Sequence, residues 1–304
     1  MTKVTSRKKN FDIPEENVLL SGHYGCPGCG QALAIRYIVI TMGENTISTI
    51  PPSCAAIISG AQPLSSMRIP LYQTTLESSA ASAAGIRRAL NRQGMNDVNV
   101  LSIAGDGGTY DIGFQALSGA AERNEDIVYV CLDNEGYMNT GNQKSGASPH
   151  LVATATTPGG KPTAKKNLAE IMVAHGIPYV ATASSGFPDD LARKVAKARD
   201  MRGEGLRFIV CLIACPTGWG VKDNDAIKIA RLAVDTGLFP LYEVDHGTYT
   251  INRGPQGVPV REYYRLQKRY NHLTDADIQQ LQEEMEFGWE KLMERVECGS
   301  GGNR

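Results

Sequence analysis

The sequence alternates short apolar runs with longer amphipathic segments along most of its length. Five runs rich in Val, Ile and Leu predict buried strands at 45–50, 98–105, 126–134, 178–184 and 206–214. Apolar residues at helical spacing predict helices at 31–42, 77–93, 112–123, 165–175 and 189–201. Nearly continuous apolar strands are typical of parallel sheets that are covered on both faces. We therefore predict an α/β fold, with a doubly wound, mostly parallel sheet flanked by helices.

The 304 residues are enough for one large α/β domain with an addition at each end. We expect an N-terminal arm over 1–20, the α/β domain over 21–235 and a C-terminal extension over 236–304. The extension is expected to be helical at 260–296, where Thr274 is a suitable N-cap with Asp277 three residues later. This helix would pack its apolar side on the core or on a partner subunit. Two glycine-rich loops, 136–164 and 214–224, are long enough to predict functional roles.

The balance of charges argues against several classes of partner. Lys and Arg number 31 against 32 Asp and Glu, a net charge of −1, so nothing favours nucleic acid or an anionic membrane. The N-terminus is basic but has no apolar stretch behind it, which argues against a signal peptide. No apolar run is long enough to cross a bilayer. We expect a cytoplasmic protein with no membrane and no nucleic-acid partner.

The most informative motif follows the second predicted strand, which runs into Gly105-Asp106-Gly107-Gly108. The glycines let the backbone approach a ligand closely, and the start of the following helix favours an anion such as phosphate. A carboxylate beside phosphates requires a divalent cation between them. Asn134, 28 positions after Asp106 (134 − 106) and at the end of the next strand, can complete the shell of a hard cation such as Mg²⁺. The alternative is a strand–helix–strand unit whose glycines only make a turn.

Seven cysteines without a secretory signal indicate metal binding or buried thiols before disulfides. Cys26 and Cys29 form a Cys-x-x-Cys pair, Cys54 follows 25 positions later (54 − 29), and Cys215 precedes a proline far downstream. Four thiolates can hold a [4Fe–4S] cluster, while Zn²⁺ on four cysteines and a thioredoxin-type redox pair are the alternatives. Cys211 competes with Cys215 as the fourth ligand. Because Cys211 lies inside a predicted strand with apolar neighbours, Cys215 is favoured.

The stretch "GDGGTYDIGFQALSGAAERN…LDNEGYMNTGNQKSG" resembles the thiamine-diphosphate motif of the β subunits of 2-oxoacid:ferredoxin oxidoreductases, the pyruvate synthase group. The segments "GHYGCPGCG", "ACPTGW" and "PLYEVDHGTYTINR" are similar to the same family, and the resemblance runs from about residue 10 to residue 290. One departure is Ser53 before Cys54, where the family commonly has glycine. The resemblance implies three cofactors: thiamine diphosphate, Mg²⁺ and a [4Fe–4S] cluster.

The resemblance also assigns residues to these cofactors. It implies Mg²⁺ ligands at Asp106, Asn134 and the backbone carbonyl of Gly136, and cluster ligands at Cys26, Cys29, Cys54 and Cys215. It implies a diphosphate cradle of Gly105, Gly107, Gly108 and Thr109, with the catalytic candidates Asn139 and Thr140 beside the thiazolium and the substrate. The remaining cofactor-binding candidates are Gly28, Tyr137, Met138 and His23. For His23 the alternative is a loop histidine bonded to backbone.

The activity implied by the resemblance is the oxidative decarboxylation of a 2-oxoacid, with electrons passed one at a time to the cluster and on to ferredoxin. Pyruvate is the expected substrate, converted to acetyl-CoA and CO₂ or formed in the reverse direction. Oxalate, 2-oxoisovalerate, 2-oxoglutarate, phenylglyoxylate and indolepyruvate are alternative substrates. A non-redox thiamine-diphosphate decarboxylase or synthase and a zinc-stabilised scaffold are alternative classes.

The resemblance implies a heteromeric assembly, because no segment of this chain resembles the domain that supplies the glutamate bound to the aminopyrimidine ring. Expected partners are an α subunit that supplies this glutamate and the substrate pocket, γ and ferredoxin-like δ subunits or domains, and ferredoxin. Coenzyme A is expected to take up the acyl group.

Overall fold

The computed structural model describes residues 18–300, with side chains to residue 298, so most of the arm expected over 1–20 lies outside the described residues. The strands are β1 (Thr46–Ile50), β2 (Leu71–Gln73), β3 (Asn99–Gly105), β4 (Val128–Asp133), β5 (Tyr179–Ser184), β6 (Arg207–Leu212), β7 (Leu241–Asp245) and β8 (Thr248–Arg253). The helices are α1 (Gly30–Met42), α2 (Cys54–Ser59), α3 (Ser79–Arg92), α4 (Phe114–Glu122), α5 (Leu168–Ala174), α6 (Pro188–Asp200), α7 (Pro216–Trp219), α8 (Ala226–Asp235), α9 (Arg261–Tyr264) and α10 (Asp275–Ser300). A π-helical turn η1 (Gly107–Asp111) and two 3₁₀ turns, η2 (Asp223–Asp225) and η3 (Lys268–Tyr270), complete the described elements.

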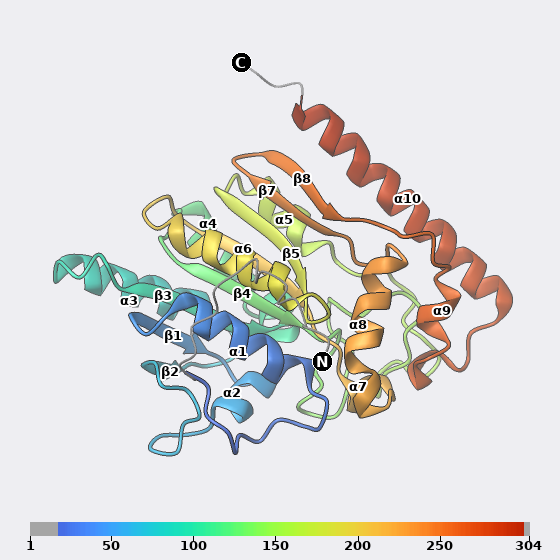
Figure 1. Ribbon diagram of the computed structural model, residues 1–304, viewed down its shortest axis with the longest axis horizontal. Helices are drawn as coiled ribbons and strands as arrows, with labels where there is room; N and C mark the ends of the chain where they lie inside the picture. Colours follow the sequence, from blue (N-terminus) through green and yellow to red (C-terminus); the bar gives the residue numbers. More distant parts are fainter. Residues whose placement is uncertain (1–17, 301–304) are drawn as a thin grey trace, which may run out of the picture.

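The eight strands form one sheet in the order β2-β1-β3-β4-β6-β5-β7-β8 (Figure 1). The six strands from β2 to β5 in that order are parallel, while β7 and β8 add an antiparallel edge. All five predicted strands are confirmed as β1, β3, β4, β5 and β6. The strands β7 and β8 belong to the residues expected to form the C-terminal extension, and they extend the same sheet. The fold is therefore the expected doubly wound, mostly parallel sheet with two further strands at one edge.

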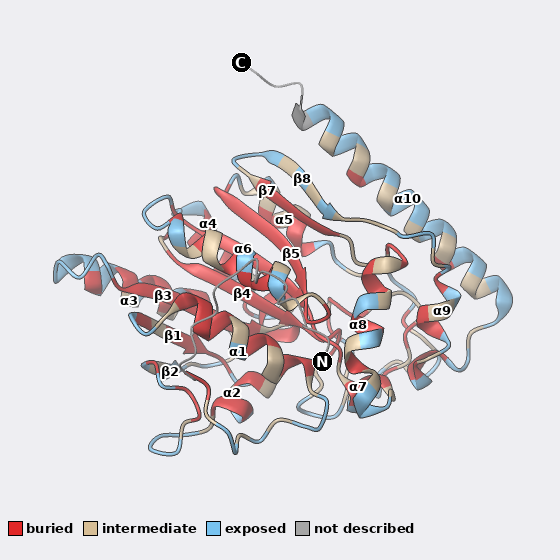
Figure 2. Ribbon diagram, viewed as in Figure 1, coloured by how far each residue is buried: buried red, intermediate tan, exposed pale blue. Residues whose placement is uncertain are grey.

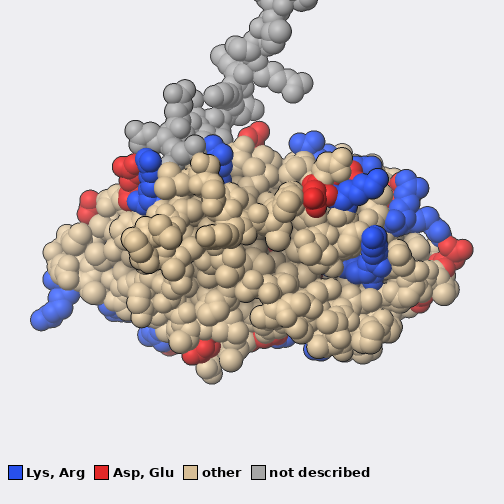
Figure 3. Space-filling view, turned by 90° about the horizontal axis from the view of Figure 1, so that it is seen from below, with Lys and Arg blue, Asp and Glu red and all other residues tan. Residues whose placement is uncertain are grey.

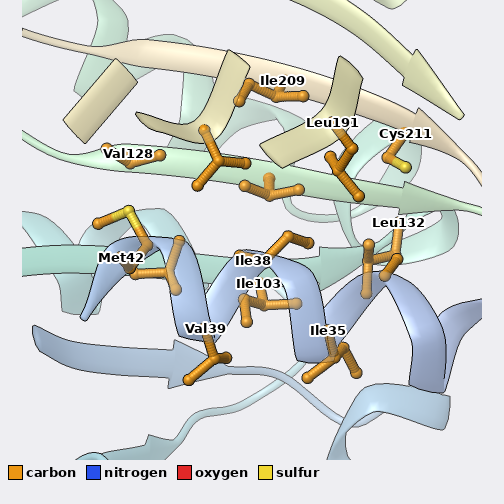
Figure 4. Close-up of a cluster of buried hydrophobic side chains, with 14 of the residues drawn as sticks. Ile35, Ile38, Val39, Met42, Ile103, Val128, Leu132, Leu191, Ile209 and Cys211 are labelled. Carbon is orange, nitrogen blue, oxygen red and sulfur yellow. The ribbon is translucent and has the colours of Figure 1, made fainter. Parts of the chain in front are cut away.

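The central strands of the sheet are buried (Figure 2), and their side chains alternate between two cores, one on each face of the sheet. Leu101 and Ile103 of β3 pack with α1 and α6 on one face (Figure 4), and Val100 and Ala104 pack with α3 and α4 on the other. This alternation follows from the two-residue period of a strand. Apart from β2, the parallel strands are buried along almost their whole length, as their apolar sequences predict.

The helix α10 begins where the sequence predicts. The backbone N–H of Thr274 donates to the Asp277 carboxylate (2.8 Å), and the backbone N–H of Asp277 donates to the Thr274 hydroxyl (3.2 Å). This reciprocal pair satisfies N–H groups that the first helical turn leaves free. The helix α10 runs alongside β8 (Figure 1) and buries Leu281 and Leu292 against the body.

The side of the molecule that carries α2 and the loops around it is largely uncharged. Figure 3 views the molecule from this side, and Lys, Arg, Asp and Glu lie mostly around its margin. Large apolar side chains are exposed in these segments: Tyr24 is 76% exposed, Ile57 48%, Leu64 83% and Tyr72 55%. Large exposed apolar side chains on an uncharged side are typical of a surface that a partner covers.

Candidate functional site

A cavity of about 130 Å³ lies at the carboxyl ends of the parallel strands β3 and β4, where ligands bind in open α/β sheets. Its lining contains ten of the residues implied by the resemblance: Gly105, Asp106, Gly107, Gly108, Asn134, Gly136, Tyr137, Met138, Asn139 and Thr140. Cys54 lines the same cavity, together with Gln31, Pro52, Ser53 and Leu76. Segments around residues 54, 106 and 136 are thus brought to one place by the sheet.

The glycine motif opens the helix after β3 with the π-helical turn η1 rather than near Ile112. A Cβ on Gly107 would lie 2.2 Å from Cε1 of Tyr137, so only glycine fits beneath this ring. The Tyr137 hydroxyl donates to the Asp111 carboxylate (3.0 Å) and to the Gly107 carbonyl (3.3 Å). Through Tyr137, the segment after β4 therefore packs on and hydrogen-bonds to the turn that contains Gly107.

Asp106 is a buried carboxyl group of the cavity lining whose pKa is strongly raised. Its side chain is almost fully buried, and burial together with the neighbouring Asp133 raises the pKa of Asp106 well above the usual range. The Ser145 hydroxyl donates to Oδ2 of Asp106 at 2.5 Å. A buried carboxyl beside a second buried carboxyl is stabilised as an anion when a cation lies next to it.

The side-chain amide of Asn134 points at two acceptors, the carbonyl oxygen of Gly136 and Oδ1 of Asp106, at 2.8 and 3.0 Å. With its nitrogen toward them, the amide donates to both. With its oxygen toward them, three oxygens converge, as they do around a cation. Octahedral Mg²⁺ has oxygen ligands at about 2.1 Å, so neighbouring ligands lie about 3 Å apart. The residues present therefore fit a magnesium ion.

The two catalytic candidates lie at the mouth of the cavity. Asn139 and Thr140 are exposed and line it. The Thr140 hydroxyl donates to Oε1 of Gln143 at 2.6 Å, which holds the turn in place. Both side chains are accessible to a bound molecule.

Three cofactor-binding candidates lie outside the cavity lining. Thr109 is completely buried, and its hydroxyl donates to the Gly105 carbonyl (2.7 Å) and contacts the Tyr129 hydroxyl. His23 accepts a hydrogen bond from the Gly25 backbone at Nδ1, which matches the loop-histidine alternative. Gly28 has a positive φ of 67° and would clash with the Asp223 backbone if it carried a Cβ. For Gly28 and His23 a role toward the cofactor stays a prediction, and for Thr109 only its backbone could serve.

Three of the four candidate cluster cysteines lie at the starts of helices. Cys29 is the N-cap of α1, Cys54 is the first residue of α2, and Cys215 is the N-cap of α7, where its Sγ accepts from the Gly218 N–H at 3.4 Å. Cys26 precedes Cys29 in a turn closed by the Cys29 N–H bonded to the Cys26 carbonyl. Free N–H groups at helix starts stabilise thiolates, so these positions suit ligation of a metal.

The charges of these four thiols act on one another. Burial raises the pKa of Cys54 to about 12, with added contributions from Cys215, Cys29 and Cys26. Burial likewise raises the pKa of Cys215 to about 11, and Cys29 and Cys26 add to it. Over residues 18–298, however, no three His, Cys, Asp or Glu side chains are arranged to hold a metal ion as they stand.

Cys211 has different surroundings from Cys215. It is fully buried in the core with α1 and α6 (Figure 4), and its pKa is raised by burial and by the carboxyls of Asp190 and Asp133. The other candidate cysteines do not contribute to this shift. These differences favour Cys215 over Cys211 as the fourth ligand, which stays a prediction.

Sequence reasoning missed a buried ionic network behind the cavity. The Lys165 ammonium lies 2.6 Å from Oδ2 of Asp133 and 3.4 Å from Oε1 of Glu135, and Nη2 of Arg269 donates to Oε2 of Glu135 at 2.6 Å. The acidic run "DNE" at the end of β4 was a partial signal, because buried carboxyls require cationic partners. Ser145, which donates a hydrogen bond to Asp106, was also missed, because nothing in the sequence indicates that these two distant residues lie together.

Residues 53–211 match the family model of the C-terminal TPP-binding domain of thiamine pyrophosphate enzymes. The chain is 46% identical to the pyruvate synthase subunit PorB of Methanocaldococcus jannaschii, over 90% of this chain and 95% of that protein. It is 42% identical to the ketoisovalerate oxidoreductase subunit VorB of Pyrococcus furiosus, over 95% of this chain and 97% of that protein. A solved 2-oxoglutarate:ferredoxin oxidoreductase from Magnetococcus marinus, 23% identical, has the same fold with a TM-score of 0.58 over 74% of this chain and 82% of that chain.

The fold and the matched domain define a thiamine pyrophosphate enzyme. Within that class, the chain belongs to the β subunits of 2-oxoacid:ferredoxin oxidoreductases, the group of PorB and VorB. Among the described residues, no helix is both long and apolar enough to cross a membrane.

Proposed function

We propose that the cavity at the ends of β3 and β4 binds thiamine diphosphate through Mg²⁺, and that this chain carries out its family's reaction there. The observation that carries the proposal is the convergence of the Asn134 amide, the Gly136 carbonyl and the buried Asp106 carboxyl on one point of the cavity. Burial and Asp133 hold the pKa of Asp106 high, so a divalent cation would stabilise its carboxylate. Ser145 would orient that carboxylate by its hydrogen bond.

The bound cofactor would supply an electron sink for decarboxylation. The chain's own residues would hold it in place. The backbone of Gly105, Gly107 and Gly108 would approach the diphosphate, since the start of the helix that follows favours phosphate. Tyr137, bonded to Asp111, would keep the glycine turn and the Asn134–Gly136 segment in register. Asn139 and Thr140, exposed at the mouth, would contact the substrate.

The four cysteines Cys26, Cys29, Cys54 and Cys215 would hold a [4Fe–4S] cluster that accepts electrons one at a time. Two observations support this assignment. The thiols influence one another electrostatically, and three of them begin helices. Cys54 also lines the cofactor cavity, which would bring the cluster within electron-transfer reach of the cofactor. The donor set of four thiols fits such a cluster.

Substrate choice rests on the relatives. The proteins to which this chain is similar are named for pyruvate and for ketoisovalerate, at 46% and 42% identity. We take pyruvate as the substrate, converted to acetyl-CoA and CO₂ with coenzyme A as acyl acceptor, or formed in reverse. 2-Oxoisovalerate, 2-oxoglutarate, oxalate and phenylglyoxylate are the acids to test beside it.

The assembly proposed for this chain contains an α subunit, γ and ferredoxin-like δ subunits or domains, and ferredoxin, in the cytoplasm. The relatives are named as subunits, which agrees with a multisubunit enzyme. The largely uncharged side of the molecule in Figure 3 suits the α subunit. Ile57 and Leu64, which are exposed and close in sequence to Cys54 of the cavity lining, would be covered by that subunit.

The deciding experiment measures the visible spectrum and the iron and zinc content of the chain after anaerobic purification, for wild type and Cys26→Ala. About four irons per chain, a brown colour bleached by dithionite and their loss in Cys26→Ala would support the cluster. One zinc and no colour would refute the electron-accepting role. Testing 2-oxoacids with the α partner present would then identify the substrate.

A further inference from the structure

A buried arginine of the C-terminal segment, Arg269, contacts the segments that carry both proposed sites. Its guanidinium carbon lies 4.0 Å from the ring centre of Trp219 and 5.0 Å from that of Tyr270. Its side chain is 6% exposed, so these cation–π contacts are made away from water, where they are strongest. Nε donates to Gln267 at 2.8 Å, which fixes the plane of the guanidinium.

One set of contacts reaches the proposed magnesium ligands. Nη2 of Arg269 donates to Glu135, the residue between the candidate ligands Asn134 and Gly136. Glu135 has a positive φ of 67°, a backbone conformation that is unfavourable for glutamate and persists only when neighbours enforce it. The Ser148 hydroxyl bonded to the Glu135 carbonyl and the ion pairs with Arg269 and Lys165 are those neighbours. The orientation of the amide and the carbonyl on either side depends on this conformation.

A second set of contacts reaches the proposed cluster ligand. Trp219, on which Arg269 stacks, lies in the single-turn helix α7 that Cys215 caps. The backbone N–H of Trp219 donates to the Cys215 carbonyl at 2.9 Å. Its indole N–H donates to the carbonyl of Asn134, also at 2.9 Å. These two hydrogen bonds connect Trp219 to both segments, and its complete burial holds the indole ring in one orientation.

We propose that Arg269 is a positioning residue that couples the two sites, holding the Asn134–Gly136 segment and the Cys215 helix in one fixed arrangement through Glu135 and Trp219. This inference rests on the proposed function. It predicts that removing Arg269 disturbs cofactor binding and cluster retention together, although Arg269 does not line the cavity. The distance between cofactor and cluster governs electron transfer, so a rigid connection of this kind serves the reaction.

The test uses the full chain co-expressed with its partner subunits and purified anaerobically. Binding of Mg²⁺ and thiamine diphosphate is measured by calorimetry, and the rate of iron release to a ferrous chelator is measured separately. We expect Arg269→Met to weaken binding about tenfold and to speed iron release about fivefold. Trp219→Phe keeps a ring under the guanidinium but removes the indole N–H, and it should move both readouts in the same direction. This second variant decides the matter if Arg269→Met fails to fold.

Two matched controls separate positioning from stability. Arg265→Met removes an exposed arginine from the same segment, and Val244→Ala makes a cavity in β7 away from both sites. Neither should change either readout. If folded Arg269→Met and Trp219→Phe bound thiamine diphosphate as tightly as the wild type, the inference would be overturned. It would also be overturned if only one of the two readouts changed, or if Val244→Ala changed them equally. A wild-type protein that binds no thiamine diphosphate would instead overturn the proposed function.

Discussion

The loop between Ser145 and Ala164 is organised around one buried ammonium, that of Lys161. Its Nζ donates to the carbonyl oxygens of Ser148 (2.8 Å), Thr163 (2.9 Å) and Ala164 (2.8 Å), and the residue is 3% exposed. Lys161→Met keeps the apolar stem but leaves three carbonyls without their donor. Each hydrogen bond to a charged group contributes about 1.5–3 kcal/mol, so the three together contribute about 4–9 kcal/mol.

Two effects reduce this sum. Burial lowers the pKa of Lys161 to about 8, and methionine escapes that desolvation cost. Some of the freed carbonyls can also turn toward water. We therefore expect Lys161→Met to lower the free energy of unfolding by about 2–4 kcal/mol. Because the loop begins at Ser145, which bonds Asp106, cofactor affinity should fall as well.

Urea denaturation of the full chain at pH 7 checks this expectation, with Lys144→Met as the control. Lys144 is exposed and directly precedes this loop, so its replacement should change the free energy of unfolding by less than about 0.5 kcal/mol. The slope against urea should be the same for all three proteins. If Lys161→Met were as stable as Lys144→Met, the reasoning that the ammonium organises the loop would be refuted.

Three further predictions concern single side chains. Asp106→Asn should leave the cofactor-free chain as stable as the wild type or make it more stable, because burial raises the pKa of Asp106. The same change should weaken Mg²⁺-dependent binding of thiamine diphosphate by about 100-fold or more in calorimetry. Unchanged affinity would contradict the proposed site. Gly107→Ala should cost about 1–3 kcal/mol in urea denaturation, because its Cβ meets the Tyr137 ring, and Tyr137→Ala should recover part of that loss. Burial raises the pKa of Glu243, but Lys197 outweighs this and holds that pKa below its usual value, so the pair stabilises the fold above about pH 4.5 and is lost as the pH falls through the lower folded pKa. Lys197→Met should therefore cost about 1 kcal/mol at pH 7 and less in acid once Glu243 is protonated, and a cost that does not fall with pH would contradict it.

Five of the six parallel strands could be predicted from the sequence, because they are buried on both faces and their sequences are nearly continuous apolar runs. The remaining strands lack that signal. The strand β2 has three residues, and β8 alternates exposed and half-buried positions that include Asn252 and Arg253. The strand β7 joins the sheet by pairing with β5, as between Val180 and Val244, and the sequence gives no sign of so distant a partner.

The candidate site divides in the same way. Residues within the glycine motif and the segment after β4 could be predicted because they adjoin one another in the sequence. Ser145, Lys165 and Arg269 could not, since only the folded chain brings them to Asp106, Asp133 and Glu135. Thr109 follows the glycines in the sequence, but the π-helical turn directs its hydroxyl to the Gly105 carbonyl, which the sequence could not show.

The four cysteines proposed as cluster ligands come from segments far apart in the chain: Cys54 follows Cys29 by 25 positions (54 − 29), and Cys215 follows Cys54 by 161 (215 − 54). The proposed cluster on these thiols would be a covalent cross-link that closes both loops. The conformational entropy removed from the unfolded chain grows with the logarithm of loop length, so a cross-link over so long a loop stabilises the fold by several kcal/mol. Oxygen that destroys the cluster would then release these loops as well as remove an electron acceptor. For a chain built in this way, damage by air is a problem of folding as much as of redox chemistry.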